Sequence, residues 1–317
     1  MSSVVKKPAL VAVIDIGSNS IKSLVAARAP DGQLVALKQR TLDARISAGI
    51  SKDKPVLSEE GMTRGLGAIR ELIEEVGQRR PAKIQLVATS AVRDASNGAA
   101  FRERVKKATK HDIRILSGDE EANLVGRGLT CDPALAELQN FYVFDLGGGS
   151  LECLAFQNRK IQQAVSLQLG CVRLTEKFIK DPAAPVPMET LAEIAAHVTA
   201  TVKEAGINFN LPESVAIGTG GTVTTVRAIL GAREQLRAEE TSPAVGTDQL
   251  RELLTTLSAL SLDQRKRVPG MPSARADVFP AALTTVVALA ELGGFAGFIH
   301  SFYNLRWGLA SEMLDQM

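Results

Sequence analysis

The stretch VFDLGGGSLECLAF, residues 143–156, holds three successive glycines between two apolar runs, with one acidic residue before them and another after them. A similar stretch, VIDIGSNSIKSLVA, stands at residues 13–26. At a shift of 130 positions (145 − 15) the two stretches align, and the aligned pairs are Asp15 with Asp145, Gly17 with Gly147, Ser20 with Ser150, Lys22 with Glu152, and Leu24 with Leu154. A match of this length at one register predicts a duplicated half.

Each glycine-containing turn ends one predicted strand and begins the next. Residues without a Cβ let a ligand approach backbone amides closely, and successive N–H groups can form a nest for an anion. Either turn alone is equally well explained as a plain hairpin turn, but the pair favours phosphate binding. The predicted phosphate ligands are Gly17, Ser18, Asn19 and Ser20 in the first turn and Gly147, Gly148, Gly149 and Ser150 in the second.

Two aspartates, Asp15 and Asp145, stand directly beside the predicted phosphate site. A carboxylate next to a phosphate is electrostatically unfavourable unless a divalent cation or an ordered water lies between them. Mg²⁺ prefers oxygen ligands and retains water molecules. The sequence therefore predicts a site for Mg²⁺, or another divalent cation, at these two aspartates.

A third glycine loop, IGTGGTVTTV at 217–226, follows a predicted strand and opens a predicted helix. Amides at a helix N-terminus attract anions, which makes Gly220, Gly221 and Thr222 further candidates for phosphate binding. The loop lacks the Gly-Lys-Ser/Thr of a P-loop and the spacing of dinucleotide sites, so on its own it is a weak signal.

The pattern of predicted elements repeats after each of the two stretches. The first is followed by a strand near 33–42, a helix near 58–79, a strand at 83–89, a helix from about 99 and a strand at 112–117. The second is followed by a strand near 161–169, helices near 171–179 and 188–205, a strand at 214–218 and a helix from 222. This pattern predicts an α/β protein with two domains flanking a cleft. We expect one domain of residues 1–128 and 301–317, in which a terminal helix near 305–314 returns to the first part of the chain. The other expected domain is 129–300, and the chain crosses between the two domains near 131–140.

Composition excludes several classes of protein. The 317 residues are 45% hydrophobic and 23% charged, which is typical of a globular protein, and the net charge of +2 gives no field that attracts nucleic acid. Three cysteines without a Cys-x-x-Cys pair indicate reduced thiols. No apolar run reaches the roughly 18 residues of a membrane span, and Asp15 interrupts the N-terminal apolar stretch before it could serve as a secretion signal. We expect a cytoplasmic protein with no membrane partner.

Seven motifs in order now resemble one family. They are DIGSNSIK, ATSAVRDASNG, SGDEEANLVGRGL, DLGGGSLE, GCVRLTEKF, GTGGT and RADVFPAALTTV, and together they extend over about residues 10–309. The chain resembles the exopolyphosphatase and guanosine pentaphosphate phosphatase (Ppx/GppA) family. The resemblance implies two ribonuclease-H-like domains of the actin-like ATPase superfamily around a cleft, in agreement with the duplication.

The carboxylates of the motif SGDEEANL differ in their expected roles. Ser117 and Glu120 have the spacing of a capping box, and Glu121 points about 100° away from Glu120 on a helix. On spacing alone, an exposed glutamate in a first turn is the simpler interpretation of Glu121. The resemblance instead implies that Glu121 is the catalytic base. It also implies catalytic roles for Asp145 and Glu152, with Glu152 orienting water or joining Asp15 and Asp145 as a metal ligand.

Other positions follow the family less closely. Lys22, a further predicted phosphate ligand, stands where the family usually has Arg, which keeps the charge and loses a bidentate fork. Leu151 stands where Thr is usual. Arg93 matches the family's Arg, and the resemblance implies that it neutralises bound phosphate. A surface ion pair between Arg93 and Asp94 is the alternative.

The expected function is metal-assisted hydrolysis that releases orthophosphate. Long members of the family carry a further C-terminal histidine–aspartate metal fold; this chain ends at Met317 with three histidines, which favours inorganic polyphosphate over guanosine pentaphosphate. A sugar or acetate kinase that binds adenosine at 218–221 is one alternative. A sensor of polyphosphate or alarmone is another, although Glu121, Asp145 and Glu152 are all present. The resemblance is compatible with a homodimer, for which the sequence locates no interface.

Overall fold

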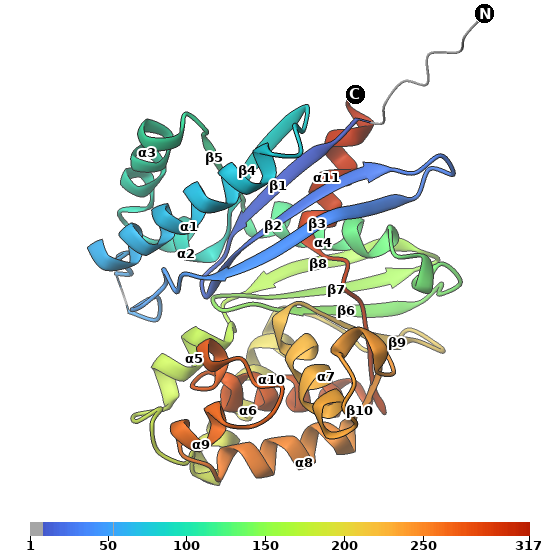
Figure 1. The fold of residues 1–317 in the computed structure, drawn as a ribbon. Coiled ribbons are helices and arrows are strands. Elements are labelled where there is room, and N and C mark those ends of the chain that lie inside the picture. Colours follow the sequence, from blue (N-terminus) through green and yellow to red (C-terminus); the bar gives the residue numbers. More distant parts are fainter. Residues whose placement is uncertain (1–8, 53) are drawn as a thin grey trace, which may run out of the picture.

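The computed structural model describes residues 9–52 and 54–317 (Figure 1). Residues 1–8, part of the N-terminal segment in which no secretion signal is expected, lie outside the described residues. The chain forms two mixed sheets, one from each sequence repeat, and in Figure 1 the first sheet lies above the second, which has helices of the same repeat below it. We call the part built on strands β1–β5 the first half and the part built on strands β6–β11 the second half. No helix in the described part of the chain is both long and apolar enough to cross a membrane.

The first half contains a five-stranded sheet in the order β3-β2-β1-β4-β5. Strand β2 is antiparallel to both of its neighbours, β1 and β3, and β4 and β5 continue the sheet in parallel with β1. The strands are β1 Val11–Ile16, β2 Ser20–Arg28, β3 Leu34–Asp43, β4 Lys83–Ala88 and β5 Ile113–Ile115. The helices are α1 Glu59–Gly77, α2 Ser90–Asp94, α3 Gly98–Thr109 and α4 Gly118–Thr130.

The second half contains a six-stranded sheet in the order β10-β11-β9-β6-β7-β8. Its strands are β6 Phe141–Leu146, β7 Leu151–Gln157, β8 Lys160–Leu167, β9 Val215–Thr219, β10 Ala244–Gly246 and β11 Gly297–His300. Its helices are α5 Cys171–Phe178, α6 Met188–Glu204, α7 Gly221–Arg233, α8 Thr247–Ser258, α9 Leu262–Lys266 and α10 Phe279–Gly293, and α11 Leu305–Asp315 ends the chain. Short 3-10 helices span Pro133–Leu135, Ala238–Glu240 and Ser273–Arg275. When the edge strand β10 is left out, the strand order and strand directions of the second sheet match those of the first sheet. This confirms two ribonuclease-H-like halves.

The duplication extends to details of the backbone. Asp15 pairs with Lys22 across the first hairpin, and Asp145 pairs with Glu152 across the second. The two turns close through the same hydrogen bond, from the Gly17 amide to the Ser20 carbonyl at 3.2 Å in the first and from Gly147 to Ser150 at 3.0 Å in the second. The next strand pair shifts register after Val25 in one half and after Ala155 in the other, again 130 positions apart (155 − 25).

Local sequence explains where the elements begin and which face they bury. Ser58 caps α1 by accepting a hydrogen bond from the Gly61 amide, and the buried residues that follow recur at helical spacing: Gly61, Gly65, Ile69, Leu72 and Val76. The central strands β1 and β6 are almost continuously apolar because both faces of each sheet are covered. Both signals were visible in the sequence.

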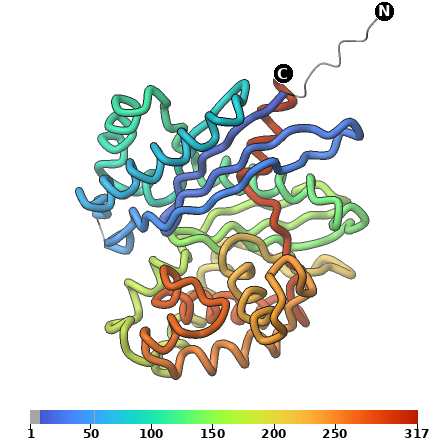
Figure 2. Tube along the Cα trace, in the orientation of Figure 1, coloured from blue at the N-terminus to red at the C-terminus, as the bar shows by residue number. Residues whose placement is uncertain are grey.

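Helices α4 and α11 connect the two sheets. One core cluster contains residues from β1 and β2, from β6 and β7, and from both helices: Val13, Leu24, Val143, Leu154, Val125 and Leu309. The terminal helix α11 packs against α4, β1 and β2, and Figure 2 shows this red segment returning beside the blue strands. Because α4 also contacts β7 and β8 of the second half, the division into 1–128 with 301–317 and 129–300 remains a prediction.

The crossing of α4 and α11 depends on two glycines. A Cβ on Gly308 would lie 1.9 Å from the Leu124 carbonyl oxygen, and a Cβ on Gly128 would lie 2.0 Å from the Asn304 carbonyl oxygen. We expect Gly308→Ala to lower the free energy of unfolding by about 1–3 kcal/mol, because the two backbones must separate. Urea unfolding measures this loss.

Gly67→Ala is the matched control, because Gly67 lies on an exposed face of α1 and its Cβ would meet no atom within 4 Å. We expect this change to stabilise the fold by about 0.4–1 kcal/mol. An unfolding midpoint of Gly308→Ala equal to that of the wild type would contradict the close helix crossing.

Candidate active site

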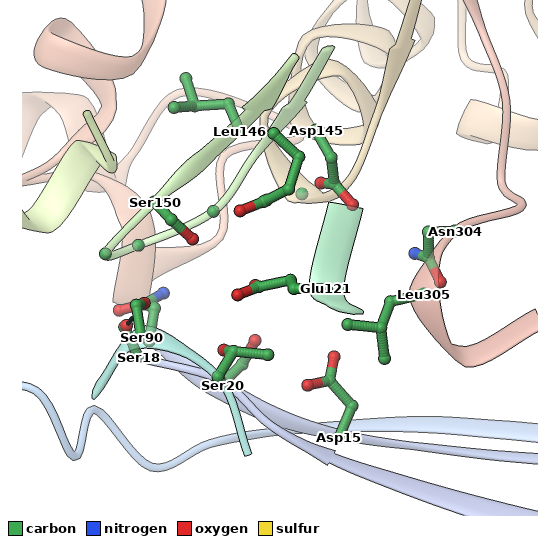
Figure 3. Close-up of a pocket in the computed structure, with 18 of the residues that line it drawn as sticks. Asp15, Ser18, Ser20, Ser90, Glu121, Asp145, Leu146, Ser150, Asn304 and Leu305 are labelled. Atoms are coloured by element: carbon green, nitrogen blue, oxygen red, sulfur yellow. Dashed lines mark hydrogen bonds between the residues drawn. The ribbon is translucent and has the colours of Figure 1, made fainter. Parts of the chain in front are cut away.

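The two repeated turns line one cavity between the halves. Its walls include, from the first half, Asp15, Gly17, Ser18, Asn19, Ser20, Lys22, Thr89, Ser90, Glu121 and Val125 and, from the rest of the chain, Asp145, Leu146, Gly147, Gly148, Gly149, Ser150, Glu152, Gly221, Arg275, Asn304 and Leu305. Figure 3 shows Glu121 between two groups of side chains, with Asp145 and Ser150 on one side and Asp15 and Ser20 on the other. We call this space the acidic cavity.

Glycine is required where the second turn meets the first half. A Cβ on Gly149 would lie 2.3 Å from the Ser90 hydroxyl oxygen, and a Cβ on Gly148 would lie 2.8 Å from the Cβ of Ser18. The Ser18 and Ser90 hydroxyls lie 3.3 Å apart and form a hydrogen bond. The absence of side chains in the second turn therefore brings backbone amides of one half against hydroxyls of the other.

Helix α4 presents the predicted base to this cavity. The capping box is confirmed: the Ser117 hydroxyl accepts from the Glu120 amide at 3.1 Å, and a Glu120 carboxylate oxygen accepts from the Ser117 amide at 2.8 Å. The next residue, Glu121, is only 5% exposed and lines the cavity. Arg93 Nη1 donates to Glu121 Oε2 at 2.7 Å. Glu121 is therefore held at a defined place in the cavity, whereas spacing alone favoured an exposed side chain.

Burial raises the pKa of the carboxyl groups in this cavity. It raises the pKa of Glu121 to about 7, against the opposing effect of Arg93, and the charges of Asp15 and Asp145 add to the rise. Burial likewise raises the pKa of Asp145 to about 6, and the pKa values of Asp15 and Glu152 also lie above their usual range. A group of acids this poorly solvated favours bound cations.

Several cations lie beside the acids. Burial lowers the pKa of Lys22 to about 8, and the neighbouring Arg306 and Arg275 lower it further. Arg306 Nη1 donates to the Ser23 carbonyl at 3.2 Å, while its buried Nε has no partner in the described residues. The Arg275 side chain forms no hydrogen bond or ion pair within residues 9–52 and 54–317. Cations this close together favour binding of an anion.

The cations line a second cavity of about 370 Å³, which we call the basic cavity. It shares Lys22, Gly221, Arg275 and Asn304 with the acidic cavity. Its other walls include two further cations, Arg40 and Arg306, one acidic residue, Glu239, and Thr41, Gly220, Thr224, Thr225 and Phe302. An acidic space that contains Glu121 thus adjoins a basic space that does not.

Two predicted phosphate ligands are placed elsewhere. Thr222 is fully buried, and its hydroxyl donates to the Leu146 carbonyl at 3.4 Å, so the structure does not bring it into either cavity. Arg93 also lines neither cavity, because its guanidinium is engaged by Glu121 and, at 3.4 Å, by Asp94. Arg93 thus forms the ion pair with Asp94 that was the alternative expectation, but its shorter ion pair is with Glu121. Gly220 lines the basic cavity alone.

Arg275 and Arg306 were not among the site residues predicted from the sequence. Arg275 begins the motif RADVFPAALTTV that contributed to the resemblance, so a signal was present. Arg306 lies in the terminal helix with no motif around it. Its position is apparent only once α11 is packed against the first half.

The predicted metal ligands are only partly brought together. No three His, Cys, Asp or Glu side chains in the described residues form a group that could hold one ion, so Asp15, Asp145 and Glu152 do not form the expected three-acid site. One reason is that Glu152 Oε1 accepts a hydrogen bond from the Ser166 hydroxyl at 2.8 Å. Asp15 Oδ1, by contrast, is buried without a partner. Because Mg²⁺ usually takes one or two carboxylates together with water and substrate phosphate, Asp15 and Asp145 fit this cation.

The fold and the cavity define a class of protein. Two halves whose sheets share one strand order, and whose glycine-containing turns line one cavity, form the two-domain α/β fold that the resemblance implied. The model of the Ppx/GppA phosphatase family matches residues 24–317, and the chain belongs to that family. The resemblance found in the sequence is confirmed.

Solved structures and curated proteins agree with this membership. The exopolyphosphatase of Cytophaga hutchinsonii is 25% identical, with a TM-score of 0.86, over 97% of this chain and 98% of that one. The PPX-GPPA enzyme of Aquifex aeolicus has the same fold, with 24% identity and a TM-score of 0.77 over 96% of this chain and 99% of that one. The guanosine-5'-triphosphate,3'-diphosphate pyrophosphatase of Vibrio atlanticus is 27% identical over 100% of this chain. The chain spans only 61% of the length of that relative.

Proposed function

We propose that this chain is a phosphohydrolase that releases terminal orthophosphate from inorganic polyphosphate by attack of water. The observation that carries this proposal is the position of Glu121, which Arg93 holds in a cavity lined by the phosphate turns of both halves. A phosphohydrolase needs a carboxylate near the attacking water and donors around the phosphate. The acidic cavity supplies both.

In the proposed reaction the two turns bind the terminal phosphate through their amides and through the hydroxyls of Ser18, Ser20 and Ser150. The water oxygen bonds to phosphorus while the carboxylate of Glu121 takes its proton. The bond to the bridging oxygen breaks, and the shortened chain leaves with that oxygen and its charge. A divalent cation held by Asp15 and Asp145 would offset the charge of the phosphate when bound.

The basic cavity is where the leaving part of the substrate would lie. Because Lys22 and Arg275 line both cavities, a chain whose last phosphate lies beside Glu121 would have its leaving part beside cations. Negative charge that develops on the leaving oxygen is stabilised there. This arrangement favours a substrate that is anionic along its whole length.

Guanosine pentaphosphate is the alternative substrate, and relatives of both kinds occur among the similar proteins. Phe302 is the only aromatic side chain among the described residues that line the basic cavity. Its ring meets that of His300 edge-on, with centroids 4.5 Å apart, and the Arg227 guanidinium lies 5.4 Å from its centre. A guanine base would have only this partly occupied ring to stack on. A polyphosphate or alarmone sensor without turnover is the third, less favoured function.

Phosphate release from the two substrates tests the proposal. We expect the full chain with Mg²⁺ to release orthophosphate from polyphosphate faster than from guanosine pentaphosphate at equal concentrations of terminal phosphate. Faster release from guanosine pentaphosphate would reverse the assignment of substrate. Tight binding of either compound without any release would instead identify a sensor.

A further inference from the structure

A single arginine of the second half contacts three segments at the boundary between the halves. Arg173, in α5, is 9% exposed. Its Nε donates to the Gly149 carbonyl at 3.1 Å, its Nη1 to the Ile50 carbonyl at 2.8 Å, and its Nη2 to Asp94 Oδ2 at 2.7 Å. Arg173 therefore joins the second phosphate turn to a loop and to α2 of the first half.

The contact with Asp94 continues to the predicted base. Asp94 Oδ1 accepts from Arg93 Nε at 3.4 Å, and Arg93 Nη1 donates to Glu121 Oε2 at 2.7 Å and to the Leu116 carbonyl at 3.2 Å. Charges alternate along the series Arg173, Asp94, Arg93 and Glu121. Arginine has donors only, so each carboxylate in the series must act as acceptor. Asp94 therefore holds Arg93 through a different nitrogen from the one that donates to Glu121.

We propose that Arg173 is a positioning residue that acts through Asp94 and Arg93 to fix Glu121 when the two halves are in contact. The proposal rests on the phosphohydrolase function given above and adds a means by which contact between the halves orders the base. With Arg173 in place, both oxygens of Asp94 are used and Arg93 is held in one orientation. Without it, Asp94 no longer holds Arg93 in one orientation, and the contact between Arg93 and Glu121 loses its order.

A neighbouring contact, made by Glu176, allows a positioning role to be distinguished from a role in holding the two halves together. Glu176, one turn further along α5, accepts from the Gly49 and Ser51 amides at 2.8 and 3.1 Å and from the Ser51 hydroxyl at 2.8 Å. These bonds also join α5 to the first half. They do not lead to Glu121, so Glu176 supplies a matched control.

Asp94→Asn is the decisive variant, because an asparagine side chain keeps the shape and has only one acceptor oxygen for two arginines. Arg173 keeps its bonds to Gly149 and Ile50 in this variant. We expect kcat for phosphate release to fall by about 10- to 100-fold with little change in KM, the size of effect that a misplaced catalytic group produces. Glu176→Gln is expected to keep the wild-type kcat.

Arg173→Lys completes the test through a double-mutant cycle. We expect Arg173→Lys to lower kcat, and Asp94→Asn in the same chain to add little, because both changes interrupt one series. Multiplicative losses, a wild-type kcat in Asp94→Asn, or an equal fall in Glu176→Gln would each overturn the inference. Thermal midpoints of all variants are measured alongside, and Asp94→Asn still decides the matter if Arg173→Lys does not fold.

A crystal structure of Asp94→Asn distinguishes failure of this inference from failure of the proposed function. Loss of the ordered Arg93–Glu121 contact supports the positioning role even if the wild type releases no phosphate. An unchanged contact overturns it, whatever the activity. An inactive wild type defeats the proposed hydrolysis alone.

Discussion

Glu121→Gln is expected to lower the rate of phosphate release by about 10²- to 10⁴-fold, the contribution of a positioned general base. The amide keeps the shape of the carboxylate and still accepts the hydrogen bond from Arg93, but it cannot take a proton from water. Substrate affinity should remain close to that of the wild type, because the turns and the cations are untouched. Phosphate release and direct binding of polyphosphate measure the two quantities separately.

The pH dependence gives an independent reading of the same group. Burial raises the pKa of Glu121 to about 7, and only the ionised form can act as a base. The rate should therefore rise as the pH increases through about 7, and this limb should be absent from Glu121→Gln. If the residual rate of Glu121→Gln still rose with pH through about 7, the titrating group would be another residue.

The adjacent glutamate supplies the control. Glu120 closes the capping box and pairs with Arg114 at 2.8 Å, outside the acidic cavity. We expect Glu120→Gln to cost at most about 0.5–2 kcal/mol of stability, as for the loss of a helix cap, and to leave the rate unchanged. Equal losses of rate in Glu120→Gln and Glu121→Gln would remove the distinction between the two residues.

Much of the fold could be predicted because the relevant signals are local or repeated. The shift of 130 positions that aligned Asp15 with Asp145 also relates the turn hydrogen bonds and the register shifts of the two sheets. Hydrophobic periodicity located α1, and the capping box located the start of α4. Periodicity could not show that α4 also packs on the second sheet, because that contact depends on the relative placement of the halves.

The site was less predictable wherever tertiary packing decides the partner of a side chain. Spacing separated Glu120 from Glu121, but the role of Glu121 came from the resemblance. Arg93 was expected at the phosphate and is instead engaged by Glu121, a contact between segments 28 residues apart. Thr222 was expected at the phosphate because it opens a helix, yet its hydroxyl faces Leu146 inside the second half. Position along a helix does not reveal which face is buried.

Asp145→Asn is expected to lower the rate of phosphate release by about 10²- to 10³-fold, as for the loss of one group that stabilises charge in the transition state. The same change should make the fold more stable at pH 8 without divalent cations. Asp145 lines the acidic cavity and forms no hydrogen bond or ion pair with the other described residues, while burial raises its pKa from 3.8 to about 6. An ionised Asp145 therefore costs stability that a neutral asparagine does not.

The sign of this effect depends on pH. Because the pKa of the folded state lies above that of the unfolded state, the contribution of Asp145 to stability is fully present below about pH 4 and is lost as the pH rises through about 6. Asp145→Asn should exceed the wild type by about 1–3 kcal/mol at pH 8, and the difference should shrink at pH 4. Mg²⁺ should reduce the difference at pH 8, because it binds the aspartate form.

Urea unfolding at both pH values, with exposed Asp119→Asn as the control, measures these differences. An Asp145→Asn protein that is inactive and also less stable at pH 8 would show that Asp145 serves the fold, and the cation site would then have to be sought at Asp15 alone.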